Sequence, residues 1–408
     1  MSSKSIVSLV RKTDSIYDAV KASVDLLGGM NKFVKKGDKV ILKPNLAYPY
    51  PPPATTDPRV VNAVVKLCFE AGAKSVGVGD SSSYSCKNII GMGRWDNKGL
   101  MDAWGMQQAV QGTDADIRDF DFEPWTMVDI PDGIVLKKTE IASAMLDSDV
   151  VINIPALKMH FETTVTLGVK NYHGILPDHY KIQFHKDDIN QKLIDIHKAV
   201  KTDLVIMDAL IGMEGTGPRT GEPVQMDLIV ASADTIALDS VSCELMGLPA
   251  DEAETNRLGQ EQGIGNMDMD RITVVGEKIQ DCCKKFKLPD IRLGGLHPGV
   301  TIIKGGPCVH CYGRARMFLD NLDSLGIENY GGISTLIVGI KPRIPDLDEV
   351  EGDVVIVGDC AIESADNLKY GLGKRAYCMT GCPPIPSLHA VVEQIQEKQK
   401  TKGDRCDG

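Results

Sequence analysis

Histidine and lysine are concentrated in one short stretch of the chain, from His160 to His185. Four of the eight histidines lie there, together with Lys170 and Lys181. Histidine can carry a proton near neutral pH or bind a metal, and lysine supplies a fixed positive charge. Because two glycines and a proline interrupt the stretch, no single helix or strand can span it. It therefore predicts a functional loop that holds an anionic substrate, with surface histidines in a long loop as the alternative. The candidate catalytic residues are His160, Lys170 and His173; Asn171 is a candidate substrate contact, and Lys181 and His185 are second choices.

A second candidate segment follows the strand-like run KVILKPNL. Lys43 and Asn45 stand where this strand ends, and they could hold a carboxylate or a phosphate. The alternative is a solvated lysine beside an asparagine that caps a turn. A proline-stiffened loop then leads into a helix, for which we predict Thr56 or Asp57 as the N-cap and Pro58 in the first turn.

Two further strand-like runs end in polar loops. The loop in DALIGMEGTGP offers Asp208 and Glu214 for substrate binding, acid–base work or metal binding, and its glycines allow close approach of a ligand. The loop GDSSSYS could bind an anion through Gly79 and its serines, or it could be a plain turn. Asp234 is predicted to cap the helix that follows it.

Cysteines form a third candidate site near the carboxyl end. Cys308 and Cys311 make a C-x-x-C turn, which can direct two thiolates at one metal. Cys360, at a predicted strand end, and Cys382, before a proline, can complete a set of four ligands for a [4Fe-4S] cluster. Structural zinc and unligated buried thiols are the alternatives. Cys378 and Cys406 are weaker candidates.

The elements that must position these residues alternate between short, β-branched apolar runs and segments of helical periodicity. This alternation predicts an α/β fold with mostly parallel sheets flanked by helices, whose ligands gather beyond the carboxyl ends of the strands. Charge, proline and glycine accumulate near residue 290. We predict three regions: an α/β region over residues 1–140, a second one over 141–290 that shares a cleft with the first, and a smaller cysteine-rich α/β domain over 291–408.

Composition narrows the partners and the compartment. A net charge of -11 argues against nucleic acid and anionic membranes as partners, although it leaves room for a local basic pocket. The start of the chain lacks a signal-peptide pattern, and no apolar run is long enough to span a membrane. Eleven cysteines without an export signal favour thiols or metal ligation over disulfides. These features predict a cytoplasmic protein.

Several of the quoted segments together resemble one known family. KPNL with TTDPRVV, GDSS, NIPALKMH with TLGVKNYHGILP, DALIGMEGTGP and ADTIALDSVSCELMG are similar to the family called domain of unknown function 362, over roughly residues 5 to 280. The resemblance implies an association with iron–sulfur motifs. In addition, VGDCA and GCPPIP resemble cluster-ligating segments of the small subunit of NADH-quinone oxidoreductases.

A looser likeness exists to the nickel-pincer lactate racemases. It would assign lysine and histidine roles to Lys170 and to His160 or His173, but LGVKN replaces the characteristic glycine-glycine-arginine-lysine run of that family.

Three functions follow from these patterns. The first is an iron–sulfur oxidoreductase or electron-transfer enzyme that acts on a small anionic substrate near the cluster, with an electron-donor protein as a possible partner. The second is a cofactor-dependent racemase or isomerase with a structural cluster, and the third is a non-enzymatic zinc-binding or carrier protein. Walker A and G-x-G-x-x-G motifs are absent from the sequence, whereas a flavin or a nickel cofactor remains compatible with it.

Overall fold

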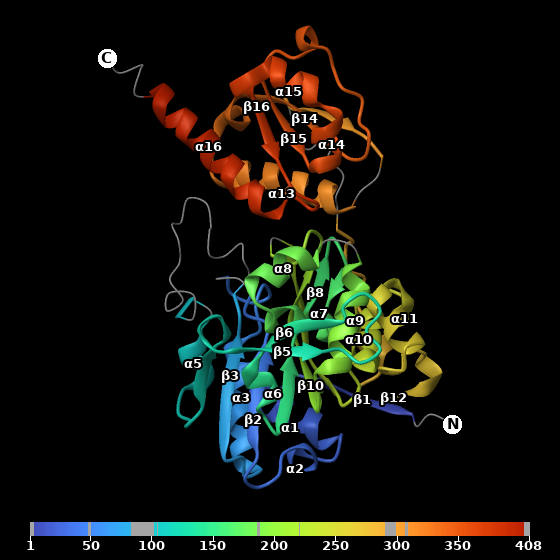
Figure 1. Ribbon diagram of the computed structural model, residues 1–408. Coiled ribbons are helices and arrows are strands. Elements are labelled where there is room, and N and C mark those ends of the chain that lie inside the picture. Colours follow the sequence, from blue (N-terminus) through green and yellow to red (C-terminus); the bar gives the residue numbers. More distant parts are fainter. Residues whose placement is uncertain are drawn as a thin grey trace. The chain divides into compact units, whose positions relative to one another are not determined.

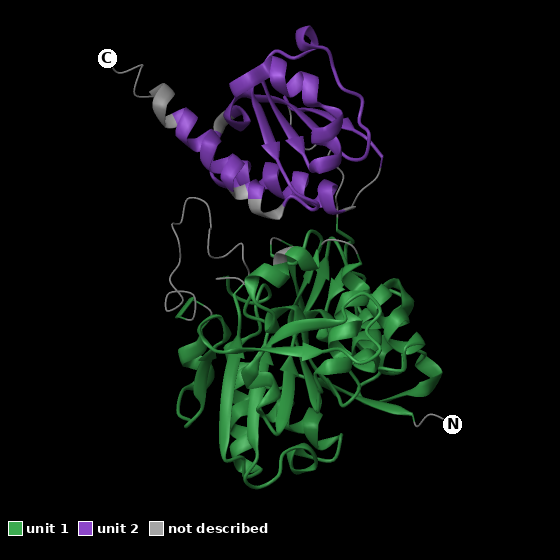
Figure 2. Cartoon of the chain, viewed as in Figure 1, with its two compact units in different colours: residues 1–86, 95–289 green, residues 87–94, 290–408 purple. Residues whose placement is uncertain are grey.

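The computed structural model describes residues 4–47, 50–82, 102–103, 105–185, 188–219, 221–289, 299–306 and 309–403. The chain divides into two compact units (Figure 2): residues 1–86 and 95–289 belong to unit 1, and residues 290–408 belong to unit 2. Among the described residues, no helix is both long enough and apolar enough to cross a membrane.

Unit 1 is built on one mixed sheet with the strand order β12-β1-β11-β10-β7-β2-β3-β4, and β8 extends it by pairing with β10 and β9 (Figure 1). The strands are β1 Ser5–Arg11, β2 Lys39–Pro44, β3 Ser75–Asp80, β4 Asp116–Asp119, β7 Val150–Ile154, β8 Ala156–His160, β9 Thr164–Thr166, β10 Leu204–Glu214, β11 Glu222–Ser232 and β12 Ile272–Gly276. A separate hairpin pairs β5 (Trp125–Asp129) with β6 (Lys138–Ala142). Most pairs are parallel, which confirms the predicted α/β class.

The antiparallel pairs involve β11 and β9. β11 runs antiparallel to both β10 and β1. A short connection, residues 215–221, joins β10 to β11, and two neighbouring strands joined so closely must run in opposite directions. Residues 161–163 join β8 to β9, an even shorter connection, and these two strands also pair antiparallel.

Helices cover both faces of this sheet. Alternate residues of β1 show the two sides, because successive side chains of a strand point to opposite faces. Val7 and Leu9 pack in the core that contains α10, whereas the Ser8 hydroxyl lies 2.8 Å from that of Ser23 in α1. The helices of unit 1 include α1 Ile16–Asp25, α2 Met30–Phe33, α3 Pro58–Glu70, α5 Met106–Val110, α6 Ser143–Leu146, α7 Gly168–Asn171, α8 Asp178–Phe184, α9 Ile189–Ala199, α10 Thr235–Leu245, α11 Glu254–Glu261 and α12 Ile279–Cys282.

Two helix starts follow the sequence rules. Asp57 caps α3, since its carboxylate accepts a hydrogen bond from the Arg59 amide at 2.9 Å, and Pro58 opens the helix. Asp234 caps α10 by accepting from the Ala237 amide at 3.0 Å. These local signals fix where the helices that follow β2 and β11 begin.

Unit 2 is a smaller α/β unit with a four-stranded parallel sheet in the order β13-β14-β15-β16. Its strands are β13 Thr301–Lys304, β14 Ile333–Val338, β15 Asp353–Val357 and β16 Ala376–Met379, and its helices are α13 Val309–Ser324, α14 Asp359–Ser364, α15 Asp366–Leu372 and α16 Ile385–Gly403. One apolar core joins a sheet face to α13 and α16, and a second core joins the other face to α14 and α15. The predicted small, cysteine-bearing α/β unit is thus confirmed.

Candidate functional site

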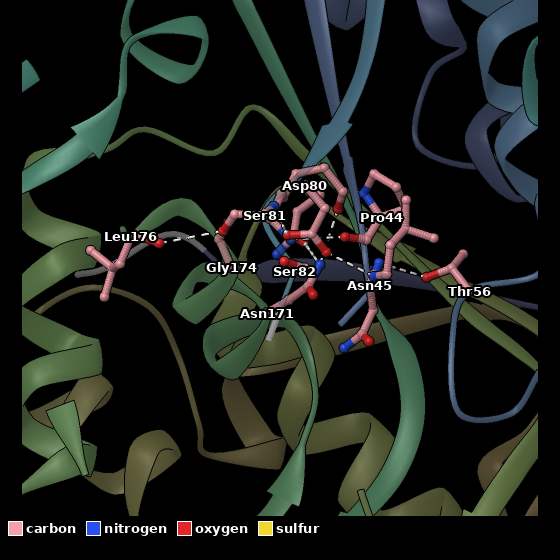
Figure 3. A network of polar contacts seen from close by, with 12 residues as sticks. Pro44, Asn45, Thr56, Asp80, Ser81, Ser82, Asn171, Gly174 and Leu176 are labelled. Atoms are coloured by element: carbon pink, nitrogen blue, oxygen red, sulfur yellow. Dashed lines mark hydrogen bonds and ion pairs between the residues drawn. The ribbon is translucent and has the colours of Figure 1, made fainter. Parts of the chain in front are cut away.

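A buried ion pair lies at the carboxyl ends of two parallel neighbours, β2 and β3. Lys43 Nζ lies 2.8 Å from Asp80 Oδ1, and the two side chains are 0% and 2% exposed. The Asp80 carboxylate also accepts the amides of Leu46 at 2.7 Å and Ser81 at 2.8 Å (Figure 3). Since a buried carboxylate needs such partners, Asp80 ties the ends of both strands together.

The short 3-10 helix Tyr172–Ile175 packs directly on this pair. A Cβ atom on Gly174 would lie 2.2 Å from Asp80 Oδ1 and 2.8 Å from Lys43 Nζ, so only glycine fits there. The Ser81 hydroxyl donates to the Gly174 carbonyl at 2.5 Å (Figure 3). The GDSSS and YHGI segments therefore meet over one charged pair.

Asn171 joins the His/Lys segment to the strands beneath it. Its amide nitrogen donates to the Lys43 carbonyl at 3.0 Å and to Asn153 Oδ1 at 2.7 Å. Asn153, in β7, donates in turn to the Gly168 carbonyl at 2.9 Å. Asn171, predicted as a substrate contact, is thus placed next to Lys43.

The start of α7 is held by a carboxylate from α10. Asp239 accepts the amides of Gly168 at 2.7 Å and Val169 at 2.9 Å. Burial raises the pKa of Asp239 to about 7, although both amide bonds oppose this shift. Asp239 therefore positions the short helix that carries Lys170 and Asn171.

Lys158, in β8, is a buried lysine that was not among the predicted site residues. Its ammonium group donates to Asn45 Oδ1 at 3.2 Å and to the Ala54 carbonyl at 2.9 Å, and the residue is 1% exposed. Burial, with smaller contributions from Lys170 and Lys43, lowers the pKa of Lys158 to about 7, although Asp80 and Asp208 oppose this shift. The one available signal was a lysine inside the otherwise apolar run NIPALKMH.

Two predicted carboxylates occupy different surroundings. Asp208 is buried in β10, where it accepts the amides of Asp57 at 2.7 Å and Leu210 at 3.1 Å. Burial raises its pKa to about 7. Glu214, at the far end of the same strand, pairs instead with the exposed Lys287, whose Nζ lies 3.2 Å from Oε1. The structure places Asp208 among the buried charges, whereas the half-buried Glu214 is in an ion pair with an exposed lysine.

Lys170 and Lys181 bring two more positive charges. Lys181 Nζ donates to the Ser81 hydroxyl and the Ser82 carbonyl, both at 2.6 Å. Lys170 is 8% exposed and acts electrostatically on Lys158 and His173. We use the name lysine network for the buried lysines and the buried Asn and Asp residues around them, namely Lys43, Asn45, Asp80, Asn153, Lys158, Lys170, Asn171, Lys181 and Asp208.

The histidines lie beside this network in different ways. His160, at the end of β8, accepts the amides of Glu162 at 3.0 Å and Thr163 at 3.3 Å on Nδ1, so a neutral ring carries its proton on Nε2. His185 Nδ1 lies 2.7 Å from the buried Glu162 carboxylate. The His173 ring centroid lies 5.1 Å from that of His185.

His173 is held neutral by its surroundings. Burial, together with the charges of Lys170, His185 and Lys181, moves its pKa well below the ordinary value. Its Nε2 has no hydrogen-bond partner among the described residues. By contrast, the exposed His179 pairs at 2.9 Å with Glu140, which is a residue of β6. His173 is therefore a half-buried ring whose inaccessible Nε2 and nearby lysines keep it neutral.

Comparison with known proteins identifies the segment that builds this network. The model of a family described as "Domain of unknown function (DUF362)" matches residues 40–244. The chain belongs to this family. A thylakoid-associated protein of Synechocystis sp. is 31% identical over 299 residues, which are 70% of this chain and 88% of that protein. The family resemblance seen in the sequence is thereby confirmed.

Two solved structures resemble the DUF362 chain at low identity. The lactate racemase apoprotein from Thermoanaerobacterium thermosaccharolyticum has a TM-score of 0.37 and 14% identity, covering 60% of this chain and 57% of that one. A Thermotoga maritima protein has a TM-score of 0.39 and 12% identity, covering 87% and 91%.

The cysteines of unit 2 lie beyond the range that the DUF362 model matches. Cys311 Sγ lies against the turn after β15, so closely that a Cβ atom on Gly358 would be 2.6 Å away. Cys360 follows this turn at the start of α14. Asp359 joins the turn to the end of β16, because its carboxylate accepts the Gly381 amide at 2.7 Å, directly before Cys382. Cys311 in α13, Cys360 in α14 and the segment that leads to Cys382 therefore meet at one end of the small sheet.

Cys378 and Cys311 lie on opposite faces of the small sheet. Cys378 packs with the core under α14 and α15, whereas Cys311 belongs to the core under α13 and α16, on the opposite face of the sheet. Cys378 is thus directed away from Cys311. Cys308 and Cys406 lie outside the described residues. None of the eight described cysteines forms a disulfide.

A site for a single metal ion needs several ligand side chains close together. In the described part of the chain, no three His, Cys, Asp or Glu side chains lie close enough together to hold one ion. Cys360 and Cys382 are exposed, whereas Cys311 is buried.

A surface groove of unit 1 lies elsewhere. It has a volume of about 580 Å³ and a mixed polar lining. Its residues are Asp14, Ile16, Tyr17, Arg59, Asn62, Lys66, Gln108 and Gln111, none of which was predicted as a site residue. Arg59, in the groove, pairs with Asp57 at 2.6 Å, and the Asp57 amide donates to Asp208 of the lysine network. The groove is therefore linked to the network through Asp57.

Proposed function

We propose that this DUF362 protein is an iron–sulfur oxidoreductase or electron-transfer enzyme that acts on a small anionic substrate. The lysine network would bind the anion, and Cys308, Cys311, Cys360 and Cys382 would hold a [4Fe-4S] cluster. The observation that carries the anion half is a cluster of buried ammonium groups: Lys43, Lys158, Lys170 and Lys181 are each at most 8% exposed. The carboxylates beside them are those of the buried Asp80 and Asp208 and of Asp178, which lies 3.9 Å from Lys181. Buried like charges are costly unless a counter-charge joins them.

Exposure within the network supports an approach from one side. Lys43, Lys158 and Asp80 are 0–2% exposed, whereas Asn45, His160 and Lys170 are 5–8% exposed. An anion would thus meet Lys170 first and would lie between it and Lys158. The neutral His173, beside Lys170, is suited to carry a proton to or from the substrate.

The cluster half rests on the chemistry of the thiols. Thiolates are the ligands of iron–sulfur clusters, and the three described candidates lie on segments that adjoin the Gly358 turn. A bound cluster supplies one-electron transfer, which lysines and histidines cannot provide. An electron-donor protein would then be the second partner.

Anaerobic purification followed by iron, zinc and acid-labile sulfide analysis tests the cluster. We expect about four iron and four sulfide per chain, and an electron paramagnetic resonance signal that changes with dithionite. Stoichiometric zinc without sulfide would support the carrier alternative. A cluster that no reductant or oxidant changes, in a protein that interconverts the stereoisomers of an anion, would support the racemase alternative.

A further inference from the structure

Lys158 differs from the other lysines of the network in its partners. Lys43 has the Asp80 carboxylate at 2.8 Å, and Lys181 has Asp178 at 3.9 Å. Within the described residues, the Lys158 ammonium donates only to two neutral oxygens, Asn45 Oδ1 and the Ala54 carbonyl. An ammonium group has three donors, and neutral acceptors compensate its charge only in part.

The charges that face Lys158 come from several elements. Lys43 of β2 and Lys170 of α7 disfavour its positive charge, while Asp80 of β3 and Asp208 of β10 favour it. His160 stands two residues further along β8, and neighbouring strands hold the backbone on which both side chains stand. The amine is therefore held by rigid strands between two cations and two carboxylates.

We infer that the lysine network takes up one proton from solvent when an oxyanion binds, and that the amine of Lys158 receives it. The inference rests on the proposed anion site. An oxyanion between Lys158 and Lys170 adds the negative charge that Lys158 lacks, and the new N–H bond then points a third donor at the anion. Specificity follows from this: an oxyanion is held by two ammonium groups, whereas a neutral ligand leaves the amine unprotonated.

The size of the effect follows from the free-state pKa of about 7 for Lys158. If bound anion raises this pKa by about two units, proton uptake is about 0.8 at pH 8 and about 0.1 at pH 6. The dissociation constant should then increase about tenfold between pH 6 and pH 8. Sulfate and oxalate suit this measurement because both stay fully ionised over that range.

Isothermal titration calorimetry of the full chain with sulfate and with oxalate, at pH 8 in buffers of different ionisation enthalpy, measures the uptake. Wild-type protein should take up nearly one proton. Lys158→Arg, whose side chain stays charged, should bind without uptake and with an affinity that does not change from pH 6 to pH 8. Lys158→Gln should bind more weakly and also without uptake. Lys39→Gln, an exposed lysine on β2, should behave as wild type.

Asp208 titrates in the same range, and Asp208→Asn separates the two groups. Uptake that persists in both Lys158 variants but disappears in Asp208→Asn would overturn the assignment to Lys158. Binding of either anion to wild type without proton uptake would overturn the inference and leave the anion site intact. Failure of wild type to bind either anion would overturn the anion site, and this inference with it.

Discussion

The two units present their candidate chemistry in opposite ways. In unit 1 the charged side chains of the lysine network are buried. They interact mostly with one another and with the backbone, as Asp80 does with Lys43 and with two amides. In unit 2 the candidate ligands Cys360, in α14, and Cys382, after β16, are exposed, and the Asp359 carboxylate joins their two segments. Removing a side chain should therefore damage the fold in unit 1, but only the ligand set in unit 2.

This difference predicts that substitutions have different effects on the stability of the two units. A buried ion pair that loses one partner leaves an uncompensated charge, which costs far more than the pair contributes. An exposed thiol that loses its metal remains solvated, so its unit keeps its core. Substitutions in each unit can test this contrast.

The largest expected effect is at the cysteines. Cys382→Ser should abolish the cluster, because serine is a poor ligand for iron in such sites, and all redox activity should be lost with it. Sulfate binding by unit 1 should be unchanged. Iron and sulfide analysis, together with sulfate titration of the same preparation, measures both.

Cys378→Ser is the matched control for that variant. Its side chain lies on the opposite face of the same sheet, so the cluster should be retained. Loss of sulfide in Cys378→Ser with full retention in Cys382→Ser would show that the ligand set is wrong.

The next effect is on the stability of unit 1. Asp80→Asn leaves Lys43 buried without its carboxylate, and we expect a loss of about 3–5 kcal/mol in the free energy of unfolding. All three tryptophans precede residue 290 in the sequence, so tryptophan fluorescence during urea unfolding follows unit 1. Asp116→Asn, an exposed carboxylate on the neighbouring β4, should change stability by less than about 0.5 kcal/mol. Equal effects of the two substitutions would contradict the structural role given to the pair.

A smaller effect concerns affinity. Lys170→Ala removes the most exposed charge of the network, and a lost charge-assisted contact is typically worth about 1.5–3 kcal/mol. The dissociation constant for sulfate should therefore increase about 10- to 100-fold, whereas Lys39→Ala should leave it unchanged. If every tested anion binds Lys170→Ala as it binds wild type, the anion site is misplaced.

Local sequence patterns carried much of the fold. The apolar runs gave the strands, and the caps at Asp57 and Asp234 were predicted because a helix start depends on residues that are neighbours in the chain. The opposite direction of β11 was not predicted, since a buried strand has the same composition in either direction.

The network itself was only partly predictable. Lys43 stood out because it stands where a predicted strand ends, and Asn171 because it lies in the His/Lys stretch. Lys158, by contrast, sits within an apolar run and looks like any strand lysine. Its burial depends on Asn45 and Ala54, more than a hundred residues away. The direction of Cys378 could have been read from AYCM, where strand alternation separates it from Tyr377 and Met379.

The smallest expected effect is a change in how the free energy of unfolding of unit 1 depends on pH. Asp239 has a folded-state pKa of about 7, above the value of about 3.9 in an unfolded chain, because burial disfavours its charge. The folded state therefore binds the proton more tightly, and its stability falls as pH increases from about 4 to about 7. Between pH 6 and pH 8 this group alone should cost unit 1 about 1.4 kcal/mol.

Asp239→Asn cannot titrate, so its stability should fall less steeply over that interval, by this same amount. The variant also turns an amide towards Gly168 or Val169 in place of an acceptor. That loss is independent of pH, and tryptophan-monitored urea unfolding at pH 6, 7 and 8 separates it from the slope. Asp251→Asn, on an exposed carboxylate beyond α10, should keep the wild-type slope. An unchanged slope in Asp239→Asn would mean that Asp239 keeps an ordinary pKa, and that the amides of α7 compensate its charge fully.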